Sequence, residues 1–122
     1  MIIVDTSVWV DHIRARNGLL LGLIAEGSIL HHPFVTAELA LGSLPDRDRF
    51  CASLGLLPAI EPIATADLLE FVVAHGLHGT GLGMVDAHLL ASTRDRQAVT
   101  LWSSDKRLAS QAERLGVAYE AV

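Results

Sequence analysis

Short apolar runs alternate along this chain with longer segments in which apolar residues recur at helical spacing. Residues 2–4 and 98–102 are the clearest strand patterns, residues 28–31 and 117–119 are further strands, and residues 59–63 form a short extended piece. Helical patterns cover residues 8–13, 33–42, 46–57, 65–75, 84–93 and 106–115. Strands that alternate with helices predict an α/β fold, with a central parallel β-sheet flanked by helices on both faces.

Length and composition limit the class of protein. The 122 residues suffice for one ordinary core and are too few for two, so we expect a single domain over residues 1–122. No apolar run approaches the roughly 20 residues that a membrane helix needs, and the first residues lack the basic start of a signal peptide. Cys51 is the only cysteine, which excludes an intramolecular disulfide and fits a reducing compartment. We expect a cytoplasmic protein without a membrane association.

Acidic residues follow two of the predicted strands. Asp5 comes directly after residues 2–4, and Asp105 comes shortly after residues 98–102. Parallel strands end at one edge of a sheet, and ligands of such sheets bind beyond that edge. If the two strands are neighbours, both carboxylates therefore point into the same crevice.

Two further acids have sequence surroundings that suggest a functional role. Asp86 lies in the first turn of a helix entered from the glycine-rich residues 76–83, and Glu38 lies on a helix that is otherwise apolar around it. An unpaired carboxylate in apolar surroundings is costly if it is buried. Each acid alone has an ordinary interpretation, as a turn residue, a helix cap, a first-turn acid or a solvated helix position. Together the four acids predict a cluster.

A cluster of carboxylates implies a bound cation. Carboxylates a few ångströms apart repel by about 1 to 4 kcal/mol per pair, so their arrangement is stable only around positive charge. Hard oxygen ligands favour Mg²⁺ or Mn²⁺ over zinc, and the six histidines do not recur at metal-ligand spacing. The formal net charge of −5 argues against a general basic surface for nucleic acid, unless the acids are concentrated in a metal site. Phosphodiester hydrolysis is the chemistry that suits such a site.

Four segments, in order along the chain, resemble the motifs of the PIN-domain family, and most closely those of VapC toxins. They are Ile3-Val4-Asp5-Thr6-Ser7-Val8-Trp9, Thr36-Ala37-Glu38-Leu39, Val85-Asp86-Ala87-His88-Leu89-Leu90-Ala91 and Leu101-Trp102-Ser103-Ser104-Asp105-Lys106-Arg107-Leu108. The resemblance spans nearly the whole chain. It departs from the commonest pattern at Ser103, where threonine is more usual and the hydroxyl is retained.

The resemblance implies a PIN-type three-layer fold and a metal-dependent endoribonuclease. The implied ligands of Mg²⁺, or of Mn²⁺, are Asp5, Glu38, Asp86 and Asp105. In the family, water attacks an RNA phosphodiester and leaves a 5′-phosphate. The resemblance also implies a homodimer and a cognate antitoxin that covers the active site.

Several other side chains have both a functional and an ordinary interpretation. Ser7 and Ser103 are supporting residues that can add hydroxyls to the site, although Ser7 can equally form a helix-start hydrogen bond. Trp9 and Trp102 adjoin apolar runs, which favours packing over base stacking. A basic rim that guides RNA is one interpretation, and solvated helix ends the other, for Arg14, Arg16, Arg94, Arg96, Lys106 and Arg107.

Two alternatives compete with the toxin hypothesis. A receiver-type phosphoacceptor domain has a similar length and an acidic Mg²⁺ pocket, but it needs paired acids after the first strand and a phosphorylatable aspartate after a middle strand. Here Asp5 is single, and no aspartate follows Ile60 or Ile63 closely. A catalytically inactive PIN-like domain that only binds a partner is the second alternative, and the presence of all four acids argues against it.

Overall fold

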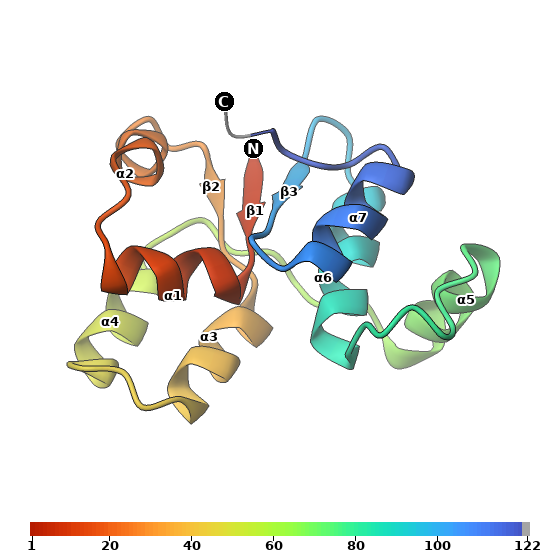
Figure 1. Cartoon of the computed structure of the whole chain (residues 1–122), viewed down its shortest axis with the longest axis horizontal. Helices are drawn as coiled ribbons and strands as arrows, with labels where there is room; N and C mark the ends of the chain where they lie inside the picture. The colour runs from red at the N-terminus through yellow and green to blue at the C-terminus, as the bar shows by residue number, and fades with distance from the viewer. Residues whose placement is uncertain (121–122) are drawn as a thin grey trace.

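A parallel sheet of three strands lies at the centre of the computed structural model, which describes residues 1–120 (Figure 1). The strands are β1 (Ile2–Val4), β2 (Ile29–Leu30) and β3 (Thr100–Trp102), in the order β2-β1-β3. β1 is the middle strand, and its three β-branched residues are all buried, as expected of a strand covered on both faces. The predicted parallel sheet is confirmed.

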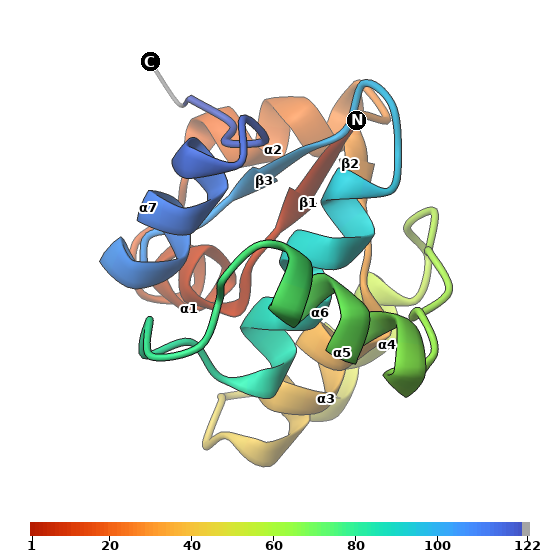
Figure 2. The same cartoon turned by 90° about the vertical axis from the view of Figure 1, so that its right-hand side faces the viewer.

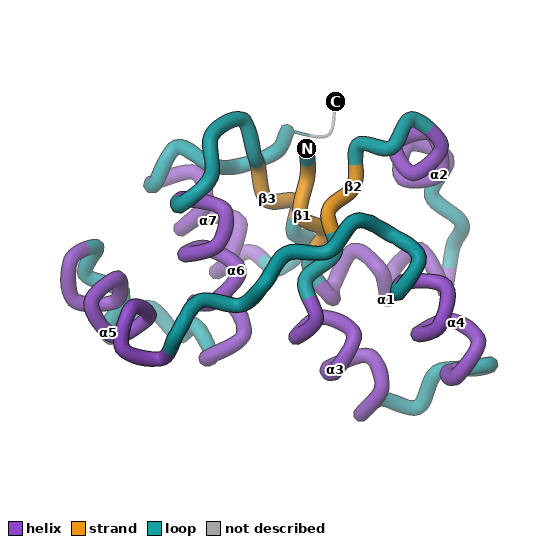
Figure 3. Tube along the Cα trace, turned by 180° about the vertical axis from the view of Figure 1, so that it is seen from behind, coloured by secondary structure: helices purple, strands orange, loops and turns teal. Residues whose placement is uncertain are grey.

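Helices lie on both sides of this sheet. Within residues 1–120 they are α1 (Thr6–Arg14), α2 (Gly18–Ala25), α3 (Pro33–Leu41), α4 (Arg47–Leu54), α5 (Thr65–Ala74), α6 (Met84–Arg94) and α7 (Lys106–Arg114). α1 packs against α3 on one side, while α6 and α7 pack against β3 on the other (Figures 1 and 2). Seen from behind, the strands lie between these two groups of helices (Figure 3). The three-layer arrangement agrees with the prediction.

The prediction of a strand at residues 117–119 is wrong. Within the described chain this segment forms only an isolated parallel bridge, and its ladder hydrogen bonds are exchanged with Leu101 alone. Residues 59–63 likewise form a single bridge, to His31. Prolines at positions 58 and 62 flank that bridge and have no N–H to donate to a longer ladder.

The sequence pattern also failed to predict α2. Its residues are apolar nearly all round, so no polar face marks a helical period, and its two glycines lower the helix propensity. The start of the helix is nevertheless capped, because the side chain of Asn17 accepts a hydrogen bond from the N–H of Leu20 at 3.0 Å. The helix is therefore fixed by its cap and by burial of Leu20 rather than by amphipathic periodicity.

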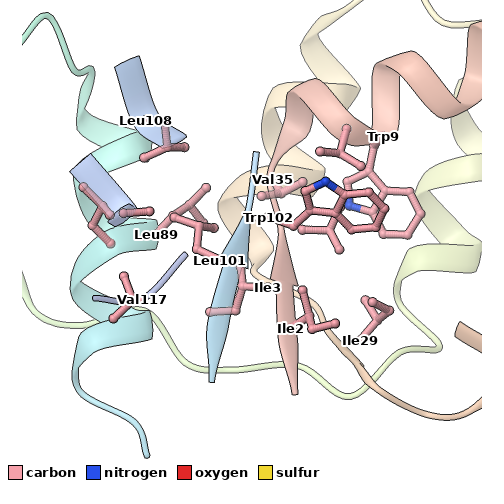
Figure 4. Close-up of a cluster of buried hydrophobic side chains, with 14 of the residues drawn as sticks. Ile2, Ile3, Trp9, Ile29, Val35, Leu89, Leu101, Trp102, Leu108 and Val117 are labelled. Carbon is pink, nitrogen blue, oxygen red and sulfur yellow. The ribbon is translucent and has the colours of Figure 1, made fainter. Parts of the chain in front are cut away.

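The hydrophobic core occupies both faces of the sheet (Figure 4). Leu101 points towards Leu89 of α6 and Leu108 of α7, whereas Trp102 points to the opposite face, towards Trp9 of α1. The two tryptophans are 3% and 8% exposed, so the prediction that they pack rather than stack on bases is confirmed. No helix within residues 1–120 has both the length and the apolar character needed to cross a membrane.

Candidate active site

Asp5 lies at the carboxyl end of the central strand. Its backbone N–H donates to the carbonyl of Trp102 at 2.9 Å, which extends the pairing of β1 with β3 by one residue. Asp5 is also the N-cap residue of α1, but its side chain makes no capping hydrogen bond. Only 4% of the residue is exposed. The backbone therefore places this residue between strand and helix, and its side chain is not used to cap the helix.

Two serine hydroxyls hold one oxygen of this carboxylate. Ser7 Oγ donates to Asp5 Oδ2 at 2.7 Å, and Ser103 Oγ donates to the same oxygen at 2.8 Å. The backbone N–H groups of Ser104 and Asp105 in turn donate to Ser7 Oγ at 2.9 Å and to Ser103 Oγ at 3.0 Å. Since each hydroxyl has one proton, these backbone donors orient both protons towards Asp5. Within residues 1–120 no hydrogen bond engages Asp5 Oδ1.

Asp105 follows β3 and begins α7. Its Oδ1 accepts hydrogen bonds from the N–H groups of Arg107 at 2.9 Å and Leu108 at 3.2 Å, so it caps the helix. The residue is exposed. The ordinary interpretation of Asp105 as a helix cap is thus confirmed. The same hydrogen bonds fix the carboxylate beside the segment that holds Asp5.

Glu38 reaches the site from α3. The side chain is half-buried, and its Oε1 accepts a hydrogen bond of 2.6 Å from Thr6 Oγ1, the first residue of α1. This contact ties α3 to the residue next to Asp5. The role of Thr6 was not predicted from the sequence. Its hydroxyl lies between Asp5 and Ser7 at the start of a helix, and this position could have suggested a role in the site.

Asp86 lies in the first turn of α6, where its Oδ2 accepts a hydrogen bond from the N–H of Gly83 at 3.3 Å. Burial raises the pKa of the Asp86 carboxyl above its ordinary value, and the Gly83 hydrogen bond opposes this rise. The neighbouring carboxylates of Asp5, Asp105 and Glu38 raise the pKa further. All four predicted acids therefore lie close enough to share one electrostatic environment.

Known proteins are similar to this chain over most of its length. The family model of the PIN domain matches residues 2–114. The chain belongs to the PIN-domain family. Ribonuclease VapC32 of Mycobacterium tuberculosis, in two strains, is 41% identical to this PIN-domain chain over 118 residues, which are 97% of the chain and 95% of that protein. The resemblance seen in the four sequence motifs is confirmed.

A solved structure supports the PIN fold. The crystal structure of PAE2754 from Pyrobaculum aerophilum superposes with a TM-score of 0.62, covering 94% of this chain and 88% of the other. The two sequences are only 15% identical, so this likeness concerns the fold alone. The predicted PIN-type α/β class is confirmed by the family match and by this structure together.

The carboxylates of this PIN domain approach one another without converging. Within residues 1–120, no three His, Cys, Asp or Glu side chains lie close enough to hold a metal ion together. Each acid is instead engaged by a nearby donor, such as Thr6 for Glu38 or Gly83 for Asp86. The donor set itself fits Mg²⁺, because it consists of carboxylate oxygens whose mutual repulsion a cation would relieve.

Four of the six basic residues do not form a rim at this site. Arg14 and Arg16 lie at or beyond the last turn of α1, whereas Asp5 precedes the first turn of that helix. Arg94 and Arg96 likewise lie at the far end of α6 from Asp86, and a helix of this length spans about 16 Å. Lys106 and Arg107, in the first turn of α7, are the two that adjoin the acids.

Three of the six histidines of this PIN domain lie in the interior. His31, His32 and His88 are buried, and the rings of His32 and His88 are 6.4 Å apart. His32 Nδ1 accepts a hydrogen bond from the N–H of Phe34 at 3.1 Å and so caps α3. Burial, together with the smaller effects of the charges of His88 and His31, lowers the pKa of His32 to about 4. His32 is therefore neutral in the folded protein near pH 7, and its role is structural.

Proposed function

We propose that this PIN-domain protein is a metal-dependent endoribonuclease that acts as the toxin of a VapBC-type toxin–antitoxin pair. The observation that carries the proposal is the buried Asp5 carboxylate, which two serine hydroxyls fix at the carboxyl edge of the sheet beside three further acids. The similarity to Ribonuclease VapC32 over nearly the whole chain supports the same activity. RNA is the proposed substrate.

Mg²⁺ is the proposed cofactor, and Mn²⁺ is expected to replace it. Asp5, Glu38, Asp86 and Asp105 are the residues that would hold the ion. When bound, a divalent ion supplies positive charge to the phosphodiester and lowers the pKa of a coordinated water. Burial, and after it the charges of Asp5, Asp105 and Glu38, raise the pKa of Asp86, and the contribution of these three acids supports the assignment.

Hydrogen bonds between side chains hold this site in place before the substrate binds. The two serine hydroxyls restrain Asp5 Oδ2 and leave Oδ1 available as a ligand atom. Thr6 restrains one oxygen of Glu38 in the same way. Because side chains held by fixed partners need no rearrangement when the substrate arrives, these hydrogen bonds contribute preorganisation. Water attack on the RNA phosphodiester, leaving a 5′-phosphate, is the proposed reaction.

A cognate antitoxin and a second copy of the chain are the proposed protein partners. Large apolar side chains that remain exposed on the described chain support such interfaces. They include Leu41 at 89%, Leu56 at 87%, Val73 at 80%, and Leu69 and Met84 each at 62% exposure. A single PIN domain over residues 1–122 and a cytoplasmic location remain predictions that fit this function.

Cleavage of a labelled total-RNA pool tests the proposal. Purified protein is incubated with Mg²⁺, with Mn²⁺ or with EDTA, beside Asp5→Asn protein prepared identically. Metal-dependent cleavage by the parent alone is expected, and the fragment ends should carry 5′-phosphates. Equal cleavage by both proteins would indicate a contaminating nuclease. No cleavage under any condition would favour a catalytically inactive PIN-like binding domain.

A receiver-type phosphoacceptor remains the alternative from another class, and neither the fold nor the comparisons favour it. The acid after β1 is single, and the family model of the PIN domain matches residues 2–114. Incubation with a small phosphodonor separates the two functions. A stable aspartyl adduct would support the receiver alternative and contradict the nuclease proposal.

A further inference from the structure

The side chain of Arg107 packs against Gly81 in the loop that precedes α6, and this packing contact is the seat of Arg107. Gly81 in this loop has a φ of +81°, and a Cβ placed on it would lie 3.1 Å from Arg107 Cδ and 3.3 Å from both Nε and Nη1. The backbone conformation and the close side chain therefore both favour glycine at this position. The aliphatic stem and guanidinium of Arg107 lie directly over the loop backbone.

The exposed guanidinium of Arg107 makes no salt bridge and no side-chain hydrogen bond within residues 1–120. The salt bridge in that part of the chain joins Arg47 to Asp48, and no hydrogen bond engages the side chain of Arg107. Two other arginines have clear structural partners. Arg94 donates to the carbonyl of Leu115, and Arg114 donates to the carbonyl of His75. Within residues 1–120, Arg14, Arg16, Arg49 and Arg96 also lack such partners, so the contact with Gly81 is what distinguishes Arg107.

Arg107 lies near the segments that carry two of the acids. Its own N–H donates to Asp105 Oδ1, and its seat at Gly81 lies two residues before Gly83, whose N–H donates to Asp86. Figure 2 shows the tip of this loop beside the first turn of α7. The guanidinium therefore lies where the segments that carry Asp105 and Asp86 meet.

We infer that Arg107 binds an RNA phosphate beside the acidic site, with its guanidinium held ready by the Gly81 seat. This inference rests on RNA being the substrate, as proposed above. RNA brings negative charge to a site that is already strongly acidic, so a cation at the edge of the site offsets repulsion. A guanidinium binds phosphate through two parallel N–H donors, and a seated side chain loses less conformational entropy on binding.

RNA binding, measured separately from cleavage, tests this role. The affinity of a fluorescent single-stranded RNA is measured by anisotropy at several salt concentrations, in Mg²⁺ and in the Asp5→Asn background. Arg107→Ala should weaken binding about tenfold, and the slope of log affinity against log salt should fall by about 0.7, the value for one phosphate contact on a single strand. Arg107→Lys should retain most of the slope with an intermediate affinity.

Two further variants complete the test. Arg96→Ala removes the same charge at the far end of α6 and should bind like the background protein. Gly81→Ala should weaken binding and add little when combined with Arg107→Ala, because both changes remove the same seated guanidinium. Melting temperatures identify variants that are misfolded.

Two results would overturn the inference. One is an Arg107→Ala protein with the affinity and salt slope of the Arg96→Ala control, including the case in which neither protein binds RNA. The other is weaker binding with an unchanged slope and a lower melting temperature, which would indicate a structural role. A parent protein that binds RNA through Arg107 without cleaving it would contradict the nuclease proposal while supporting this inference.

Discussion

The two halves of the acidic site are held in different ways. The strand-borne half, Asp5 and Asp105, follows adjacent parallel strands, and each of these carboxylates accepts two hydrogen bonds from the protein. The helix-borne half, Glu38 and Asp86, comes from α3 and α6, and each carboxylate accepts one. The strand-borne half is therefore held by more hydrogen bonds than the helix-borne half, which would need to lose fewer contacts to adjust around a cation.

The largest effect is expected from Asp5 at the centre of the strand-borne half. Asp5→Asn keeps the shape of the side chain but removes its charge, so it should lower kcat/KM for RNA cleavage at least about 1000-fold, or about 4 kcal/mol. Asp11→Asn, an exposed position on α1, serves as the matched control. Cleavage by Asp5→Asn at the parental rate would remove Asp5 from the site.

The serine hydroxyls should have the next largest effect. Ser103→Ala leaves Asp5 Oδ2 with one donor fewer, and Ser7→Ala does the same, so each should lower activity about 10- to 100-fold, as changes to groups that orient metal ligands do. Ser103→Thr retains the hydroxyl and should stay near the parental activity. Ser110→Ala, on the exposed face of α7, controls for loss of a serine. If Ser103→Ala cleaves normally, the strand-borne half is not held by these hydroxyls.

The helix-borne half should respond less to loss of its single donor. Thr6→Val removes the hydrogen bond to Glu38, and it should raise the Mg²⁺ concentration needed for half-maximal cleavage by about tenfold, with a small effect on kcat. Thr6→Ser should restore the parental requirement. Thr65→Val, at the exposed start of α5, is the control. An unchanged Mg²⁺ requirement would mean that Thr6 does not position Glu38.

Asp86 allows the combined cost of burying a carboxylate in this site and of placing it near the other acids to be measured. Its raised pKa means that the folded state disfavours the ionised carboxylate, so stability is lost as pH rises through the raised pKa. Asp86→Asn should therefore melt a few degrees higher than the parent in EDTA near pH 7. It should also lose most of the stabilisation that Mg²⁺ gives the parent. A lower melting temperature in EDTA would contradict the proposed repulsion.

The smallest predicted effect lies outside the acids, at His32. In the unfolded chain His32 takes up a proton near the ordinary pKa of 6.5, whereas in the folded protein it does so only at about 4. The free energy of unfolding therefore decreases as the pH falls from about 6.5 to about 4. His32→Asn retains an N-cap acceptor for α3 but does not titrate. Its urea midpoint should fall less from pH 7 to pH 5 than that of the parent or of His78→Asn. Parallel pH profiles would refute this account.

The sequence predicted the strand-borne half well because its geometry is local. Asp5 directly follows the three-residue strand β1, and Ser7 lies two residues after it. Ser103 directly follows β3 and lies two residues before Asp105. Thr6 was missed because its partner, Glu38, is set by the packing of α1 on α3. No local pattern encodes that contact.

Two elements of the fold and one side-chain contact were not predicted correctly from the sequence. The helix α2 is apolar nearly all round, so its periodicity carries no signal, and only the Asn17 cap marks its start. Residues 117–119 have the composition of a strand, yet their pairing is limited to Leu101. The Arg107 seat depends on a loop conformation around Gly81, which the glycine-rich segment permits but does not specify.

Binding of a divalent metal by the four acids should depend on Asp5. Titration of the protein with Mn²⁺, following the electron paramagnetic resonance signal of free Mn²⁺, measures binding without RNA. The parent should bind Mn²⁺, Mg²⁺ should compete for the same site, and Asp5→Asn should lose most of the affinity while Asp11→Asn retains it. Equal Mn²⁺ binding by the parent and Asp5→Asn would contradict the account.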